Sequence, residues 1–166
     1  VMFPSTVRAD LATGIPGELA FEGPLKARYA ILTSPSAANN IVGATYCTMT
    51  AEGVARAGGT GALGGILANP KVYASYGTVA DGPLGSTMTL PNNLNVELVF
   101  ETDGIVVVLP AAAAIGDEVI YNTTTGALAT QAPGATPGAG FARVPNTFVD
   151  HRTVAAAGIA IIRMNN

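Results

Sequence analysis

Charged side chains are scarce in this 166-residue sequence. Asp, Glu, Lys and Arg make up 11% of it, against roughly 25% in an average soluble domain. A protein that stays alone in water usually covers its surface with these residues, because they are costly to bury unpaired. Much of this surface must therefore consist of Ala, Gly, Thr, Ser and Asn. Such a surface favours permanent contact with other protein subunits, although charge-poor extracellular β proteins share the composition.

The sequence also has little of what catalysis, metal binding and nucleic-acid binding require. It has no Trp, one Cys and one His, and its net charge is −3. One Cys and one His do not make a zinc site, and no nucleophile, base and acid can be assembled around His151. Because neighbours in a strand point to opposite faces, Asp150 is not expected to orient the His151 ring. We predict no enzymatic activity, no cofactor, no metal and no nucleic-acid partner.

Long apolar runs are missing as well. The longest, residues 105–115, contains Pro110 and is shorter than the roughly 20 residues that a membrane-spanning helix needs. Residues 1–19 lack the basic start and apolar block of a signal peptide. Cys47 is alone, so no internal disulfide can form, which fits synthesis in a reducing cytoplasm. We predict no membrane partner and a buried, structural thiol at Cys47.

Glycine and proline, in contrast, are abundant: 20 Gly and 11 Pro are spread along the chain. No window of about 12 residues shows a helical period without one of them. The sequence therefore predicts a mainly-β fold, a small β-sandwich or barrel with little helix. The strongest hairpin signal is Asp103-Gly104, and Gly126 is expected to close a second hairpin with a positive φ. The predicted strands are residues 17–21, 28–33, 40–50, 94–101, 105–109 and 157–164, with the second hairpin at 118–130.

Residues 1–14 are apolar but contain no closing turn, so they are predicted to form an extended N-terminal arm before a single β domain at 15–166. Burying each large apolar side chain of the arm is worth on the order of 1.5–3 kcal/mol, so we expect the arm to dock on a partner. Residues 131–140 are predicted to be a Pro/Gly/Ala loop with nothing to pack. The predicted partner-binding residues of the arm are Val1, Met2, Phe3, Val7, Arg8 and Leu11.

The stretch Gly59-Thr60-Gly61-Ala62-Leu63-Gly64 fits the dinucleotide-binding fingerprint, with Asp81 about 20 residues on. That fingerprint requires a strand before the glycines and a helix that opens from them, so that the helix N-terminus holds the pyrophosphate. Here Gly65 follows at once and Pro70 comes soon after. We therefore interpret the glycines as a point where two backbone segments approach closely.

Several phrases together resemble the structural cement proteins of tailed-phage heads, and they span nearly the whole chain. They are GIPGE at 14–18, FEGP at 21–24, ANN at 38–40, AGGTG at 57–61, GILANPK at 65–71, LPAAAAIGD at 109–117, YNTTTGAL at 121–128 and TVAAAG at 153–158. The resemblance implies a capsid decoration protein made in the host bacterial cytoplasm that sits on the outer capsid surface of the virion. It implies the major capsid protein and other copies of the same chain, as a dimer or trimer, as partners. It transfers no catalytic residue.

Two hypotheses from other classes stand beside this one. A β-sandwich binding module that recognises a host surface or a glycan would use aromatic platforms, for which Tyr73 and Tyr76 are the candidates. An enzyme would need an acid, base or nucleophile set that the sequence does not provide. In the cement hypothesis, the β body self-associates through an apolar face and the arm adds a strand to an exposed sheet edge of an adjacent subunit.

Overall fold

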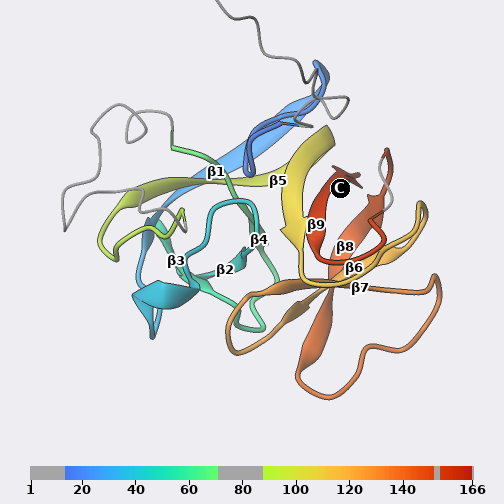
Figure 1. The fold of residues 1–166 in the computed structure, drawn as a ribbon. Coiled ribbons are helices and arrows are strands. Elements are labelled where there is room, and N and C mark those ends of the chain that lie inside the picture. Colours follow the sequence, from blue (N-terminus) through green and yellow to red (C-terminus); the bar gives the residue numbers. More distant parts are fainter. Residues whose placement is uncertain (1–13, 71–87, 152–153, 166) are drawn as a thin grey trace, which may run out of the picture.

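A computed structural model describes residues 14–70, 88–151 and 154–165, and in these ranges the chain is mainly β, as the sequence predicts (Figure 1). One short 3-10 helix, η1 (Ala37–Asn39), interrupts the strands. The strands are β1 (Leu25–Leu32), β2 (Tyr46–Ala51), β3 (Val54–Ala57), β4 (Gly64–Leu67), β5 (Asn95–Leu109), β6 (Glu118–Asn122), β7 (Leu128–Gln131), β8 (Phe141–Val149) and β9 (Gly158–Met164). The described strands form one sheet in the order β1-β3-β2-β4-β5-β9-β8-β6-β7.

The first five strands close into a small barrel. The strand β1 pairs with β3 in parallel and with the first half of β5 antiparallel, and the ring is completed by antiparallel pairs β3–β2, β2–β4 and β4–β5. Side chains alternate between the two faces of a strand, so one face of each fills the interior. This first core contains Ala30, Leu32, Val42, Cys47, Ala55, Ala57, Leu67, Leu90, Val96 and Leu98.

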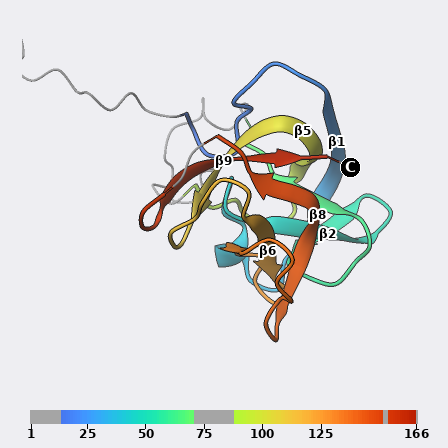
Figure 2. The ribbon, with the colours of Figure 1, turned by 90° about the vertical axis from the view of Figure 1, so that its right-hand side faces the viewer.

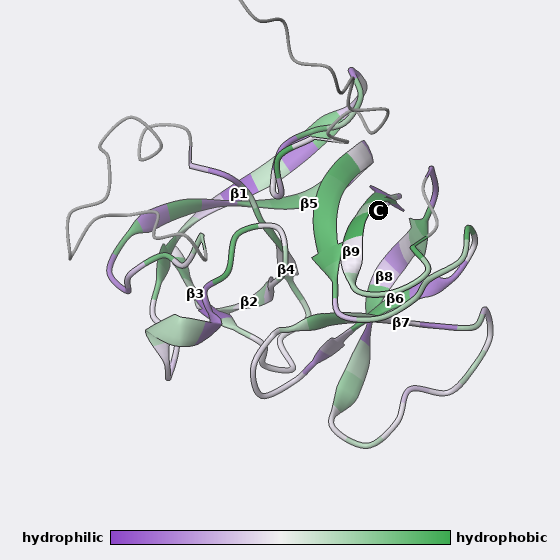
Figure 3. Ribbon diagram, in the orientation of Figure 1, coloured by the Kyte–Doolittle hydropathy of each residue, from purple (hydrophilic) through white to green (hydrophobic). Residues whose placement is uncertain are grey.

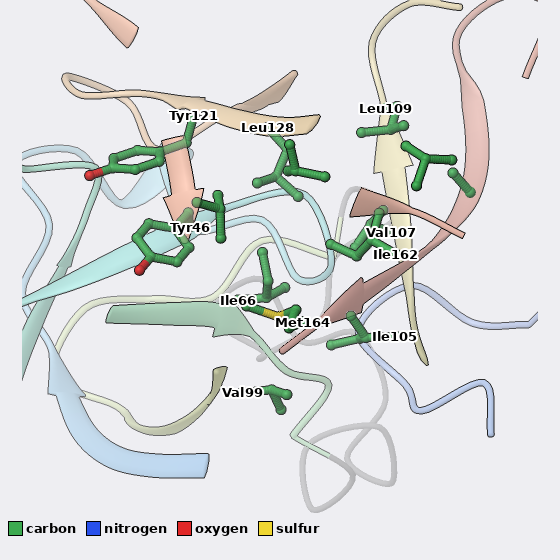
Figure 4. Packing of buried hydrophobic residues seen from close by; sticks show 14 of the residues in the cluster. Tyr46, Ile66, Val99, Ile105, Val107, Leu109, Tyr121, Leu128, Ile162 and Met164 are labelled. Atoms are coloured by element: carbon green, nitrogen blue, oxygen red, sulfur yellow. The ribbon is translucent and has the colours of Figure 1, made fainter. Parts of the chain in front are cut away.

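The second half of β5 leaves the barrel and begins an antiparallel sheet with β9, β8, β6 and β7 (Figures 1 and 2). A second core lies between this sheet and the outer wall of the barrel, with Ile66 and Val99 from the wall and Val107 and Ile162 from the sheet (Figure 4). Figure 3 shows that much of β5 is hydrophobic. The strand β5 therefore contributes side chains to both cores.

The predicted turn at Asp103-Gly104 is wrong, because β5 runs through it without reversing. Thr102 pairs with Met164 and Ile105 with Ile162, so three steps along β5 match two along β9. The extra residue makes a β-bulge, in which Asp103 and Gly104 together oppose one residue of the partner strand. The Gly104 N–H donates to Thr102 Oγ1 at 3.2 Å, and the ring of Phe21 occupies the space that a side chain at Gly104 would need.

Other strand predictions have mixed outcomes. The hairpin at 118–130 is confirmed by β6 and β7, with Gly126 at φ +77°, and the last strand is confirmed by β9. The strand predicted at 40–50 begins only at Tyr46, because the buried Asn40 side chain donates to the Leu90 carbonyl and Gly43 adopts φ +67°. Residues 17–21 form turns and bends with one isolated bridge, between Leu19 and Ile105, rather than a strand.

Candidate functional site

The outer face of β1 is an apolar surface, on a strand that pairs along its length with β5 and only at its C-terminal end with β3. Leu25, Tyr29 and Ile31 are 43%, 70% and 47% exposed, while the intervening Ala30 and the following Leu32 are buried in the barrel. The strand β5 covers one backbone edge of β1, but β3 covers the other edge only at Ile31 and Leu32. Between Leu25 and Ala30 no strand of the described residues pairs with that second edge, so the surface offers apolar side chains beside a free strand edge. Sequence patterning missed this face, because alternation with Lys26 and Arg28 predicts that the apolar side of this strand is buried and not exposed.

The predicted arm residues Val1, Met2, Phe3, Val7, Arg8 and Leu11 lie outside the described residues, as do the candidate sugar-binding residues Tyr73 and Tyr76. Their roles remain predictions. Two other tyrosines, Tyr46 and Tyr121, lie side by side with ring centroids 4.5 Å apart (Figure 4). Both are buried. They therefore belong to the second core and do not form an exposed platform for a sugar.

The Gly-rich stretch that follows β3 is a close crossing of two backbone segments, as the sequence predicts. The Gly59 N–H donates to the Thr123 carbonyl at 2.6 Å, and the Gly58 N–H donates to the Tyr46 carbonyl at 2.9 Å. The Tyr121 hydroxyl donates to the Gly59 carbonyl at 3.1 Å. The strand β4, and not a helix, follows the glycines, so the geometry that would hold a pyrophosphate is not formed. These contacts fasten the barrel to the β6–β7 turn.

The loop between β7 and β8 is exposed but tied down by side chains, which differs from the prediction that it has nothing to pack. Glu118 accepts hydrogen bonds from the Gln131 side chain at 3.0 Å and from the Gly134 N–H at 3.1 Å. Arg143 pairs with the same carboxylate at 3.1 Å and also donates to the Ala135 carbonyl at 2.6 Å. The hydrogen bonds from Gln131 and Gly134, followed by the charge of Arg143, lower the pKa of Glu118 below its ordinary 4.5.

The fastening of this loop should therefore respond to acid. The pKa of Glu118 is lower in the folded state than in the unfolded state. The ionised carboxylate therefore contributes its full stabilisation of the fold when the pH is above the unfolded-state pKa, and this contribution is lost as the pH falls through the folded-state pKa. In an NMR titration the Gly134 amide proton should shift with a midpoint below 4.5. The Glu118→Gln variant should lack this transition, and a midpoint at or above 4.5 in the unmodified protein would contradict the assignment.

Three further residues can carry chemistry: Cys47, Asp150 and His151. Cys47 is fully buried in the barrel, as predicted, and burial raises the pKa of its thiol to about 12. The prediction for Asp150 is wrong: its carboxylate lies 2.7 Å from His151 Nδ1. The strand β8 ends at Val149, so the alternation of a strand does not apply to this pair. His151 is an exposed surface histidine, and its ring packs at a tilt of 56° against the Phe21 ring, with the ring centroids 4.5 Å apart.

Within residues 14–70, 88–151 and 154–165, no three His, Cys, Asp or Glu side chains come together as a metal site. No helix of the described chain is long and apolar enough to cross a membrane.

The sequence pattern that defines the structural cement proteins (E217 gp24/Pam3 gp6) matches residues 3–165. The chain belongs to this family. The family resemblance in the sequence is therefore confirmed, and it assigns a structural role in phage to this cement protein. No curated protein matches the sequence.

A solved structure described as the capsid of Myoviridae Phage XM1 contains a chain with a similar fold. The alignment covers 99% of this cement protein and 98% of that chain, with a TM-score of 0.59 and 17% sequence identity. At this identity the comparison shows a shared fold. The barrel, the shared strand and the second sheet therefore form an arrangement that a very different sequence also adopts.

Proposed function

We propose that this protein attaches to the outer surface of a phage capsid and stabilises it by bridging neighbouring major capsid subunits. The observation that carries the proposal is the family match over residues 3–165. The likeness in fold to a chain of the XM1 capsid structure supports it. The composition agrees, because a subunit with 11% charged residues favours protein contacts over solvent.

The β1 face is the part of the described body best suited to contact another copy of the chain. Large apolar side chains gain on the order of 1.5–3 kcal/mol each when they are fully buried. Three side chains of this face, Leu25, Tyr29 and Ile31, are 43–70% exposed. Burial of each against a partner would therefore supply about half or more of that free energy. In the proposed assembly, copies associate through this face as a dimer or trimer, and residues 1–14 of each copy lie across an adjacent capsid subunit. Many such contacts on one shell act together.

Deletion of residues 1–14 tests the role of the arm. Capsids without cement protein would be mixed with the full chain or with the truncated chain, and bound protein would be measured after sedimentation. Loss of five apolar anchors should weaken binding by at least tenfold, and the temperature at which capsids rupture should fall to that of bare shells.

A variant with Val1, Met2, Phe3, Val7 and Leu11 replaced by serine keeps the length of the arm and serves as its matched control. It should behave like the deletion if apolar contacts hold the arm. Equal occupancy and equal heat resistance for all three proteins would contradict a binding role for the arm.

The Ile31→Lys variant tests self-association through β1. A charge at this position should be left without a partner in a packed interface, so sedimentation equilibrium should show a shift towards single subunits by tenfold or more in the association constant. Ile115→Lys is the matched control, because Ile115 is equally apolar and 61% exposed but lies in the segment before β6. Identical behaviour of the two variants would place the interface elsewhere.

A further inference from the structure

The few cations of this chain fall into two groups. Three of those in the described ranges are paired with carboxylates: Lys26 with Glu101 at 2.7 Å, Arg143 with Glu118 at 3.1 Å and Arg163 with Asp103 at 3.6 Å. The other two, Arg28 and Arg56, have no carboxylate of the described residues within 4.0 Å. On a chain of net charge −3, two arginines left without a counter-charge need an explanation.

Arg28 is held in place without being neutralised. Its guanidinium lies 3.7 Å from the centre of the Phe100 ring, and its Nη1 donates to the Gly64 carbonyl at 3.1 Å. Both contacts orient the group, but neither carries a full negative charge. Arg28 lines a hollow of about 310 Å³ together with Lys26 and Glu101, so this hollow has one positive charge in excess.

Arg56 faces a second hollow, of about 480 Å³, that has no acidic side chain in its lining. Its Nε makes one long contact, 3.5 Å, with the carbonyl of the next residue. Thr48, Thr50, Thr60 and Thr123 line the same hollow, and the hydroxyls of all but Thr60 already donate to backbone carbonyls of the chain. Arginine forms bidentate hydrogen bonds with carboxylates, so the Arg56 guanidinium offers donors to an anion, and no acidic side chain in the lining of the hollow repels it.

The Gly-rich segment 59–64 separates the two hollows. Gly59, Thr60 and Gly61 line the hollow of Arg56, while Ala62, Leu63 and Gly64 line that of Arg28. Leu63 between them is 53% exposed. The N–H groups of residues 60–62 donate to no acceptor in the described part of the chain, so the rim of both hollows is rich in free donors.

We propose that these two hollows and segment 59–64 form one binding surface for an acidic protein segment, which places a carboxylate at each arginine and an apolar side chain against Leu63. The inference rests on the proposed function, because the partner that it names is an acidic segment of the capsid subunit. Charge complementarity selects this partner: the surface carries two uncompensated positive charges on an otherwise acidic chain. A nucleic acid would instead face a protein whose overall charge repels it.

The experiment measures sedimentation of the full chain with capsids that lack cement protein, at low and high salt. Arg56→Gln should reduce the affinity by on the order of tenfold at low salt, and by less at high salt, because exposed charge pairs are screened. Arg56→Lys keeps the charge but not the bidentate geometry, so its affinity should lie between those of the unmodified chain and Arg56→Gln. Arg163→Gln is the matched control: it removes an arginine that already has a carboxylate partner and should leave binding unchanged.

The outcomes separate the two proposals. If the unmodified chain binds capsids and Arg56→Gln binds equally well, the acidic-segment surface is overturned and the proposed function stands. If the unmodified chain does not bind capsids, the proposed function fails and takes this inference with it. Polyglutamate should compete for binding and a DNA oligonucleotide should not; the reverse result would overturn the choice of an acidic protein segment. Circular dichroism of each variant checks that it is folded.

Discussion

Replacement of Gly58 with alanine is expected to lower the free energy of unfolding by about 3 kcal/mol, combining a disfavoured backbone angle with overpacking. Gly58 has φ +68°, which L side chains rarely adopt. An ideal β-carbon at this position would lie 2.6 Å from the Thr123 carbonyl oxygen and 2.9 Å from the Gly126 nitrogen. These are backbone atoms and cannot rotate away. Urea denaturation followed by circular dichroism would measure the loss.

Gly53 provides the matched control, because it has almost the same backbone angle, φ +69°, and nothing within 4 Å of its ideal β-carbon. Gly53→Ala should cost only the conformational penalty, about 1 kcal/mol. The difference between the two variants then measures the close crossing alone. Equal losses would mean that the backbone around Thr123 and Gly126 yields, and that the crossing does not fasten the barrel to the second sheet.

The second large effect is expected at Leu98, in the half of β5 that belongs to the barrel. Leu98 is completely buried, so Leu98→Ala leaves a cavity and should cost about 3–4 kcal/mol. Leu63→Ala makes the same chemical change at a side chain that is 53% exposed and should stay within about 0.5 kcal/mol of the unmodified protein.

Leu98→Ala also tests whether the two cores unfold together. Cys47 reports on the barrel, because its buried thiol cannot ionise at neutral pH and becomes reactive only on unfolding. Amide exchange in β9 reports on the second sheet. Since β5 serves both cores, the variant should move both signals to the same denaturant concentration. Separate transitions would show that the cores are independent domains.

The sequence was a good guide where the local signal and the final pairing agree. The hairpin around Gly126 has alternating strands and a glycine with positive φ, and its strands also pair as neighbours in the sheet. The mainly-β class could be predicted for a similar reason, because frequent Gly and Pro exclude long helices whatever the tertiary structure. The closing of the barrel by β1 and β5 could not be predicted, since their pairing joins segments some 70 residues apart.

The failures occur where tertiary contacts override a local signal. Asp103-Gly104 has the composition of a tight turn, yet the partner strand β9 and the ring of Phe21 hold it extended as a bulge. The alternation argument treats Asp150 and His151 as strand residues, but β8 ends at Val149. The candidate binding surfaces show the same limit. That Arg28 and Arg56 lack carboxylate partners, and that both lie beside segment 59–64, follows from the fold and not from their spacing.

The path of β5 has a mechanical consequence. A pull that separates the barrel from strands β6–β9 would load the peptide bonds of β5, which run unbroken from one half into the other. Covalent bonds do not yield at forces that peel strands apart, so such a pull must first rupture the hydrogen bonds along β1, β4 or β9. Because one continuous strand belongs to both the barrel and the second sheet, the two halves should extend little relative to each other before these hydrogen bonds break.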